Sequence, residues 1–217
     1  NIYSEQAKYE EALECYRRAL DIQLRVFGPN HPDVAGSYNN IGSILANQGN
    51  HQEALEYYEA AIFIRLKIFG DTHPDSAASY NNIGNVHSDL GNYEEALKNY
   101  AEAIDIQLKY LGLDHPSLAI SYNNIGSAFF YQGDFEEALR SYKKALEIQT
   151  KLYGKNHPDV AITYSNMADV YAKFGNYQDA IQYYERALAI QQKVFDPTHH
   201  AIGVTYKKLG IVKSQMN

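Results

Sequence analysis

The chain has 217 residues, of which 45% are hydrophobic and 21% are charged, and its formal net charge is −7. This composition is ordinary for a folded protein. The negative charge argues against nucleic acid as a partner, because phosphate binding needs clustered Lys and Arg. The sequence holds neither an apolar run of about 18 residues, which would predict a membrane span, nor a secretion leader, so we expect a cytoplasmic protein. The lone Cys15 excludes a disulfide scaffold, and a chain that begins with Asn1 is expected to be a segment of a longer one.

Internal repetition at a fixed period of 42 dominates the sequence. Residues 71–112 and 113–154 are identical at 20 of 42 positions, and no insertion shifts the register. A fixed period of this length indicates an array in which each unit is one supersecondary element. The clearest periodic sets are Tyr38, Tyr80, Tyr122, Tyr164 and Tyr206; Ala12, Ala54, Ala96, Ala138 and Ala180; and Ala19, Ala61, Ala103, Ala145 and Ala187.

The predicted elements are helices joined by short turns. Residues 1–27 are predicted to hold the tail of one helix and then a complete second helix. In the next unit, Pro32 suits a first helical position, because its missing N–H would be unpaired there in any residue. This helix is predicted to run to about Gln48, and a second one to run over residues 51–69 up to Gly70.

The second helix of this unit carries its apolar residues at spacings of three and four, which describe one buried stripe. A pair of such short helices cannot bury its own apolar faces, so pairs must stack into a solenoid. We expect a single array over residues 1–217, with a partial repeat at 1–28, full repeats at 29–70, 71–112, 113–154 and 155–196, and a terminal half repeat at 197–217.

Both ends of this array are predicted to be open. Ile202, Leu209 and Ile211 stand at core-like positions of the last helix, where no following helix would cover them. Because natural arrays end in polar caps, we expect this chain to fray at its ends or to associate end to end with other copies.

The repeat resembles the tetratricopeptide repeat, and the match is carried by Tyr38, Ile41, Gly42, Leu45, Gly49, Ala54, Tyr58 and Ala61. The usual unit of that family has about 34 residues, and the extra eight here lengthen the second helix. The long unit, the YNNIG segment and the NHPD loop at 30–33 are similar to the repeats of kinesin light chains. The resemblance implies an all-α fold, an α-solenoid whose antiparallel helix pairs form a right-handed superhelix, with first helices lining a concave groove.

The sequence offers no candidate for catalysis or cofactor binding. Histidines recur at period 42, but rungs about 10 Å apart are too distant to share a metal that needs ligands within about 2 Å. These histidines are expected to cap the following helices. The sequence contains no phosphate loop, no GxSxG and no HExxH, so we expect no enzyme, no cofactor and no metal. The histidine set is His31, His73, His115, His157 and His199.

The polar face of each first helix is the candidate binding surface. Asparagine amides both donate and accept hydrogen bonds, so a row of them can hold the main chain of an extended peptide. In kinesin light chains, groove asparagines hold cargo peptides, which carries over to Asn39, Asn81 and Asn123 and stops at Ser165. The remaining candidate groove residues are Ser43, Asn85, Ser127, Asn47, Asp89, Phe130, Tyr131, Asp169 and Lys173.

The asparagine pairs have two readings, because asparagine is a poor residue for the middle of a helix. We expect the first of each pair to face the groove and the second to bond across to the neighbouring repeat. This second set is Asn40, Asn82, Asn124 and Asn166. Phe130 and Tyr131 are expected either to accept an apolar anchor residue of a partner or, for Phe130, to pack against the next repeat.

Capture of a C-terminal carboxylate is not expected, because the positions that would need Lys and Arg hold Gly36, Ala78, Ile120 and Ile162. Three functions stay open. The array is a scaffold for extended segments of partner proteins, a structural spacer or self-associating module with an empty groove, or a ligand- or peptide-sensing domain of a larger signalling protein.

Overall fold

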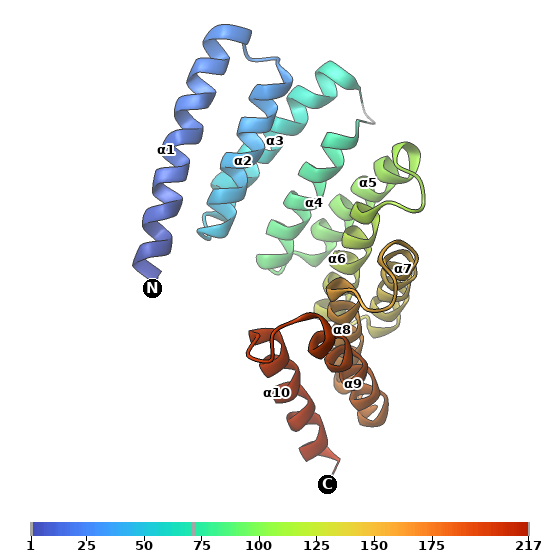
Figure 1. Cartoon of the computed structure of the whole chain (residues 1–217). Coiled ribbons are helices and arrows are strands. Elements are labelled where there is room, and N and C mark those ends of the chain that lie inside the picture. The colour runs from blue at the N-terminus through green and yellow to red at the C-terminus, as the bar shows by residue number, and fades with distance from the viewer. Residues whose placement is uncertain (1, 71–72, 217) are drawn as a thin grey trace. The chain divides into compact units, whose positions relative to one another are not determined.

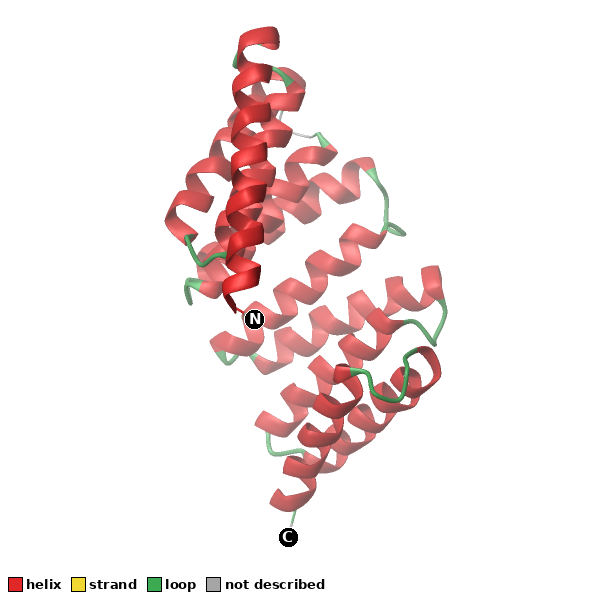
Figure 2. Ribbon diagram, turned by 60° about the vertical axis from the view of Figure 1, so that its left-hand side comes forward, coloured by secondary structure: helices red, strands yellow, loops and turns green. Residues whose placement is uncertain are grey.

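The structure, a computed structural model, describes residues 2–70 and 73–216, and every regular element in these ranges is an α-helix (Figures 1 and 2). The chain divides into two compact units, residues 1–111 and 112–217. Unit 1 holds α1(Ile2–Phe27), α2(Pro32–Asn47), α3(His51–Phe69), α4(Pro74–Asp89) and α5(Tyr93–Tyr110). Unit 2 holds α6(Pro116–Gln132), α7(Phe135–Tyr153), α8(Pro158–Lys173), α9(Tyr177–Val194) and α10(His200–Gln215).

The helices form antiparallel pairs, which confirms the predicted all-α solenoid class. Within unit 1, α2 packs on α3 and α4 on α5, and within unit 2, α6 packs on α7 and α8 on α9 (Figure 1). Each pair also packs on its neighbour, because α3 contacts α4 and α7 contacts α8. We call the even-numbered helices first helices and the odd-numbered ones second helices. The extent of one array over both units stays a prediction.

A close approach of the two helices sets the geometry of each pair. A Cβ atom added at Gly84 would lie 2.5 Å from Cε1 of Tyr100, and one at Gly42 would lie 2.9 Å from Cε1 of Tyr58. Each tyrosine ring therefore fills the space that a glycine leaves on the first helix. The fourth pair holds Ala168 at this position, fully buried, so that pair accommodates one methyl group.

Residues 2–27 form one continuous helix, so the predicted break within this segment is wrong. In the following repeat the turn depends on Gly49, which adopts a φ of +81°, a conformation that glycine enters without steric cost. The equivalent positions near the start of α1 hold Ala7 and Lys8. Both residues have high helix propensity, so nothing in the local sequence ends the helix there.

The periodic histidines cap the first helices, as the sequence predicts. In each of α2, α4, α6, α8 and α10, the histidine before the helix accepts a hydrogen bond at Nδ1 from the backbone N–H two residues later, at 3.2 or 3.3 Å. His157 also stacks on Tyr153, four residues earlier, with ring centroids 4.3 Å apart.

The last helix is better covered than the sequence suggests. Ile202 and Leu209 are buried, at 6% and 8% exposure, whereas Ile211 is half exposed. The expectation that all three lie uncovered is wrong for the first two, because α10 packs one side on α9. End-to-end association stays a prediction. Of the helices described, none combines the length and the apolar character that a membrane crossing requires.

The capping role can be tested at His157, at the start of α8. Replacing it with Ala removes the acceptor for the Asp159 N–H, so we expect the free energy of unfolding to fall by about 1 kcal/mol in urea titrations. His157→Asn keeps an acceptor oxygen and is expected to cost less than about half as much. Equal losses in the two variants would contradict the cap and assign the effect to the stacked ring.

Candidate functional site

Each first helix carries a stripe of four positions at spacings of four, three and four, which one face of an α-helix presents together. The side chains of these stripes are exposed or half-buried, and we call the stripes of each unit its first-helix face. In unit 1 the face consists of Gly36, Asn40, Ser43 and Asn47 on α2 and Ala78, Asn82, Asn85 and Asp89 on α4. In unit 2 it consists of Ile120, Asn124, Ser127 and Tyr131 on α6, Ile162, Asn166, Asp169 and Lys173 on α8, and Val204, Lys208, Ile211 and Gln215 on α10.

Asn39 lies beside this stripe and bonds to the next first helix. Its Oδ1 accepts a hydrogen bond from Ser79 Oγ at 2.9 Å and another from Asn82 Nδ2 at 3.4 Å. Ser79 is fully buried and also bonds to Nη1 of Arg65, which donates to the carbonyl oxygen of Asp75 at 2.9 Å. These bonds satisfy polar groups that burial would otherwise leave unpaired, and they fix α4 against α2.

Unit 2 repeats this arrangement with different residues. Asn123 Nδ2 donates to Thr163 Oγ1 at 3.0 Å, and Thr163 Oγ1 lies 2.8 Å from Oε1 of Gln149. A related bond in unit 1 joins Ser37 Oγ to Gln23 Oε1 at 2.6 Å. These buried bonds were not predicted from the sequence, although the residues that form them recur with the 42-residue period. Ser or Thr recurs at Ser37, Ser79, Ser121, Thr163 and Thr205, and Gln recurs at Gln23, Gln107, Gln149 and Gln191.

The asparagine pairs are oriented opposite to the expectation at two positions. The sequence predicts that Asn39 and Asn123 face the groove, but each is half-buried and bonded to the next first helix. The expected bond across repeats is confirmed for Asn82, whereas Asn40 is exposed. Asn81 is half-buried. A peptide-binding role for these residues stays a prediction.

A tyrosine hydroxyl from each of α3, α5, α7 and α9 reaches the third position of the stripe on the preceding first helix. The pairs are Tyr58 with Ser43 at 3.1 Å, Tyr100 with Asn85 at 2.8 Å, Tyr142 with Ser127 at 3.0 Å, and Tyr184 with Asp169. Burial raises the pKa of Tyr142 to about 12, and burial together with the Asp169 carboxylate raises the pKa of Tyr184. These phenols are therefore neutral at physiological pH and hold the polar side chains of the stripe in place.

Asp169 departs from the neutral residues at its position in the earlier repeats, and the structure gives it two partners. Besides the Tyr184 hydroxyl, its Oδ2 lies 2.6 Å from Nζ of Lys208 on α10. Lys208 itself stands where the earlier repeats have asparagine. The two departures compensate each other, so this predicted groove residue also holds the last helix.

The other predicted residues are accessible. Asn47, Asn85, Asp89, Tyr131 and Lys173 are exposed, whereas Ser43 and Ser127 are half-buried. Phe130 is half-buried against two other rings, with centroids 5.3 Å from Tyr131 and 6.0 Å from Phe135. These residues come from separate units, with Asn47, Asn85 and Asp89 in unit 1 and Tyr131 and Lys173 in unit 2.

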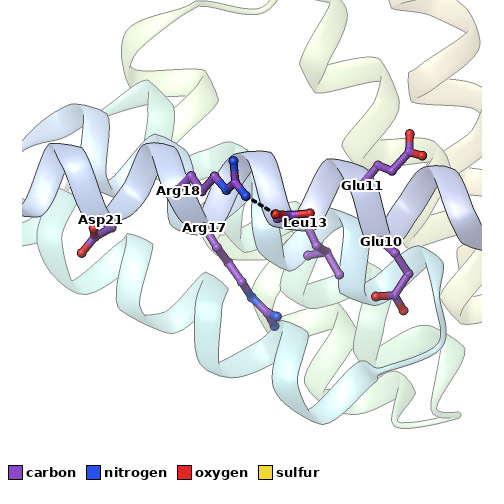
Figure 3. Close-up of a pocket in the computed structure, with 7 residues that line it drawn as sticks. Glu10, Glu11, Leu13, Arg17, Arg18 and Asp21 are labelled. Atoms are coloured by element: carbon purple, nitrogen blue, oxygen red, sulfur yellow. Dashed lines mark hydrogen bonds and ion pairs between the residues drawn. The ribbon is translucent and has the colours of Figure 1, made fainter.

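A hollow elsewhere, on α1, carries no chemistry of its own. It is lined mainly by charged side chains, among them the labelled Arg17, Arg18 and Asp21 of Figure 3. Arg18 pairs with Glu14, four residues earlier on the helix. Arg17 lies 3.4 Å from Glu53. All four side chains are well exposed, so these are ordinary solvated ion pairs. The described part of the chain contains no group of three or more His, Cys, Asp or Glu placed to hold a metal.

Stacked antiparallel helix pairs with a regular polar stripe on the first helices define an α-solenoid repeat protein. The model of the tetratricopeptide repeat matches residues 1–62, 33–109, 75–151, 117–193 and 159–217. These matches together span the chain, which therefore belongs to the tetratricopeptide repeat family. No curated protein matches the sequence.

Solved structures share this architecture. A crystal structure of BtubC (BKLC) from P. vanneervenii superposes with a TM-score of 0.78 at 22% identity, over 96% of this chain and 81% of that one. A putative kinesin light chain from Podosopora anserina, with nearly identical TPR-like repeats, gives a TM-score of 0.72 at 27% identity, over 88% and 90%. A crystal structure of the apo form of RapI superposes with a TM-score of 0.75 at 20% identity, over 88% of this chain and 68% of that one. These similarities confirm the predicted likeness to kinesin light chain repeats, and BtubC and RapI share the fold alone.

The buried tyrosines predict a loss of stability in alkali. A raised pKa in the folded state contributes stability that is complete below the ordinary value of 10.0 and is lost as the pH rises toward about 12 for Tyr142. At pH 8 we expect the free energy of unfolding of wild type to exceed that of Tyr142→Phe by about 1 kcal/mol, because the variant lacks the hydrogen bond to Ser127. Above pH 10 this gap is expected to narrow by up to about 1.4 kcal/mol per pH unit.

Urea unfolding of both proteins at pH 8, 10 and 11 measures this gap directly. Lysine deprotonation affects the two proteins alike, so the difference isolates the one phenol. A gap that stays constant from pH 8 to 11 would show that Tyr142 ionises equally in the folded and unfolded chains.

Proposed function

We propose that this chain is a non-catalytic scaffold that binds extended segments of partner proteins across the first-helix face of each unit. Tetratricopeptide repeat domains generally act in protein–protein interaction and are typically not catalytic. The observation that carries the finer proposal is the regular row of side-chain amides on successive first helices. In this row Asn40 is exposed, and Asn82, Asn124 and Asn166 are half-buried.

Amide side chains suit the capture of a main chain whatever its side chains are. Each primary amide offers two donor hydrogens and an acceptor oxygen, which can pair with the C=O and N–H groups of an extended peptide. In unit 1 we place this contact on Asn40, Asn47 and Asn85. We give Asn39 the positioning role, because its carbonyl oxygen already holds Ser79 of the next first helix.

The two faces are expected to select different peptides. Unit 1 carries 8 Lys and Arg against 16 Asp and Glu, a net charge of −8, whereas unit 2 carries 11 against 10, a net charge of +1. The stripe of unit 1 ends in Asp89 on α4, while unit 2 adds Tyr131 and Lys173 and begins with the exposed Ile120 and Ile162. We therefore expect unit 1 to favour basic, polar segments and unit 2 to favour apolar ones.

The likeness to a putative kinesin light chain with TPR-like repeats supports a scaffold over the spacer and sensor alternatives. A spacer needs no exposed amide row. A sensor of small ligands needs an enclosed apolar pocket, whereas the stripe side chains of both units are exposed or half-buried.

A displayed-peptide selection tests the proposal with one paired variant for each face. Asn40→Ala with Asn47→Ala removes amides from unit 1, and Asn166→Ala with Lys173→Ala alters unit 2. The matched control, Gln178→Ala with Gln182→Ala, removes two exposed amides from a second helix. We expect peptides enriched on wild type to bind one face variant at least ten-fold more weakly, which corresponds to a loss of about 1.4 kcal/mol in binding free energy. Their affinity for the control variant is expected to be unchanged.

Other outcomes overturn the proposal. Peptides that bind all three variants alike would place binding on another surface, and a failure to enrich any peptide would favour the spacer. A rise in melting temperature with small ligands, without peptide enrichment, would favour the sensor. Asn39→Ala is unsuitable as a face variant, because loss of the acceptor for buried Ser79 destabilises the packing of α4 on α2.

A further inference from the structure

A contiguous aromatic patch lies on unit 2, formed by Phe130, Tyr131, Phe135 and Phe174. The rings come from the end of α6, the start of α7 and the residue that follows α8. Neighbouring centroids are 5.3 Å apart for Phe130 and Tyr131, 6.0 Å for Phe130 and Phe135, and 6.2 Å for Phe135 and Phe174. The two outer rings, Tyr131 and Phe174, are 64% and 67% exposed.

The two inner rings, Phe130 and Phe135, are half-buried and pack against core residues of α7 and α8. The two outer rings, Tyr131 and Phe174, are mostly exposed, and the internal repeat shows that the other helix pairs pack without them. The positions of Phe130, Tyr131 and Phe174 hold no aromatic residue in the other full repeats. Their equivalents are Ala46, Ser88 and Ala172 for the first, Asn47, Asp89 and Lys173 for the second, and Gln48, Leu90 and Gln132 for the third. Exposed apolar groups that packing does not need mark an interaction site.

Charged side chains of both signs lie next to the patch. Lys173 precedes Phe174, Asp134 and Glu136 flank Phe135, and all three are exposed. A strongly acidic or strongly basic segment would therefore meet like charge as well as opposite charge, so the patch favours an uncharged occupant. The exposed amide of Gln132, next to Tyr131, adds hydrogen-bond donors at the edge.

We propose that this patch binds an uncharged, proline-rich segment in the polyproline II conformation. Such a segment has three residues per turn, about 9 Å, with no internal hydrogen bonds, so its carbonyl groups can accept from Gln132 and Lys173. Its flat pyrrolidine rings pack against exposed aromatic rings, and its preformed backbone lowers the entropic cost of binding. The inference rests on the proposed function, because it names one class of peptide for unit 2.

The experiment measures binding of a fluorescein-labelled ten-residue polyproline peptide to the whole chain by anisotropy. A Gly–Ser peptide of equal length and a Glu–Leu peptide serve as comparison probes. The patch variant is Phe174→Gln with Tyr131→Asn, which places at each position a residue that another repeat carries there, Gln48 and Asn47. The control variant is Phe63→Asp, which removes a 66% exposed ring from α3, where other second helices carry Asp21 and Asp105.

We expect polyproline to bind with a sub-millimolar Kd, at least ten-fold more tightly than either comparison peptide. The patch variant is expected to lose at least ten-fold in affinity, and Phe63→Asp to stay within two-fold of wild type. The inference is overturned if polyproline binds no better than the Gly–Ser peptide, if the Glu–Leu peptide binds best, or if the patch variant binds polyproline as wild type does. Circular dichroism of both variants checks that they fold.

Phe174 lies outside the first-helix face, so the single variant Phe174→Gln separates this inference from the proposed function. If selected peptides still depend on Asn40 and Asn47 or on Asn166 and Lys173 while polyproline does not bind, only the inference fails. If the selection enriches nothing and polyproline binds through Phe174, the patch stands and the amide row loses its proposed role.

Discussion

The contact between a second-helix tyrosine and a first-helix glycine is the interaction on which the geometry of the helix pairs depends. At Gly84 the ring of Tyr100 lies so close that even a methyl group would collide with it, and the buried alanines beside it keep the helix axes near each other. Because the ring is fixed, its hydroxyl has one place to go, the third position of the exposed stripe, where it meets Asn85. The same contact therefore sets the spacing of the pair and orients a polar side chain on the candidate binding surface.

A second set of constraints links one pair to the next, and it divides the polar residues of the first helices by role. Buried Ser79 and Thr163 each need a partner, and Asn39 and Asn123 supply it. Adjacent asparagines thus do different work. Asn39 holds the array together through satisfied, buried hydrogen bonds, while Asn40 stands exposed on the stripe. A residue that stabilises the packing therefore stands next to one that is available for binding. For this reason, substitution of the first asparagine would change stability as well as binding.

The architecture could be predicted from the sequence because a strict 42-residue period requires each unit to adopt the same helix pair. Helix bounds, the glycine and tyrosine contact and the histidine caps all follow from residues that recur at fixed offsets. The candidate site was harder to predict, because a helical wheel places Asn39 and Asn40 on one polar arc. Only the position of the neighbouring helix decides which of them it covers. The break expected within residues 1–27 was avoidable, since Ala7 and Lys8 stand where the turn needs glycine. Phe174 was overlooked because it follows the end of a helix, outside the wheel of α8.

Departures from the period separate structural from functional residues, provided that the structure shows what each one touches. Asp169 and Lys208 both replace neutral residues, but they pair with each other at 2.6 Å, so each explains the other and neither requires a ligand. Arg65 replaces a glutamine and finds its partners in Ser79 and the Asp75 carbonyl. Tyr131 and Phe174 differ from these cases, because both stay more than 60% exposed and no other full repeat holds an aromatic ring at either position. Exposed apolar groups of this kind are typical of interaction sites, so these two rings are the departures on which the proposed binding of a proline-rich segment depends.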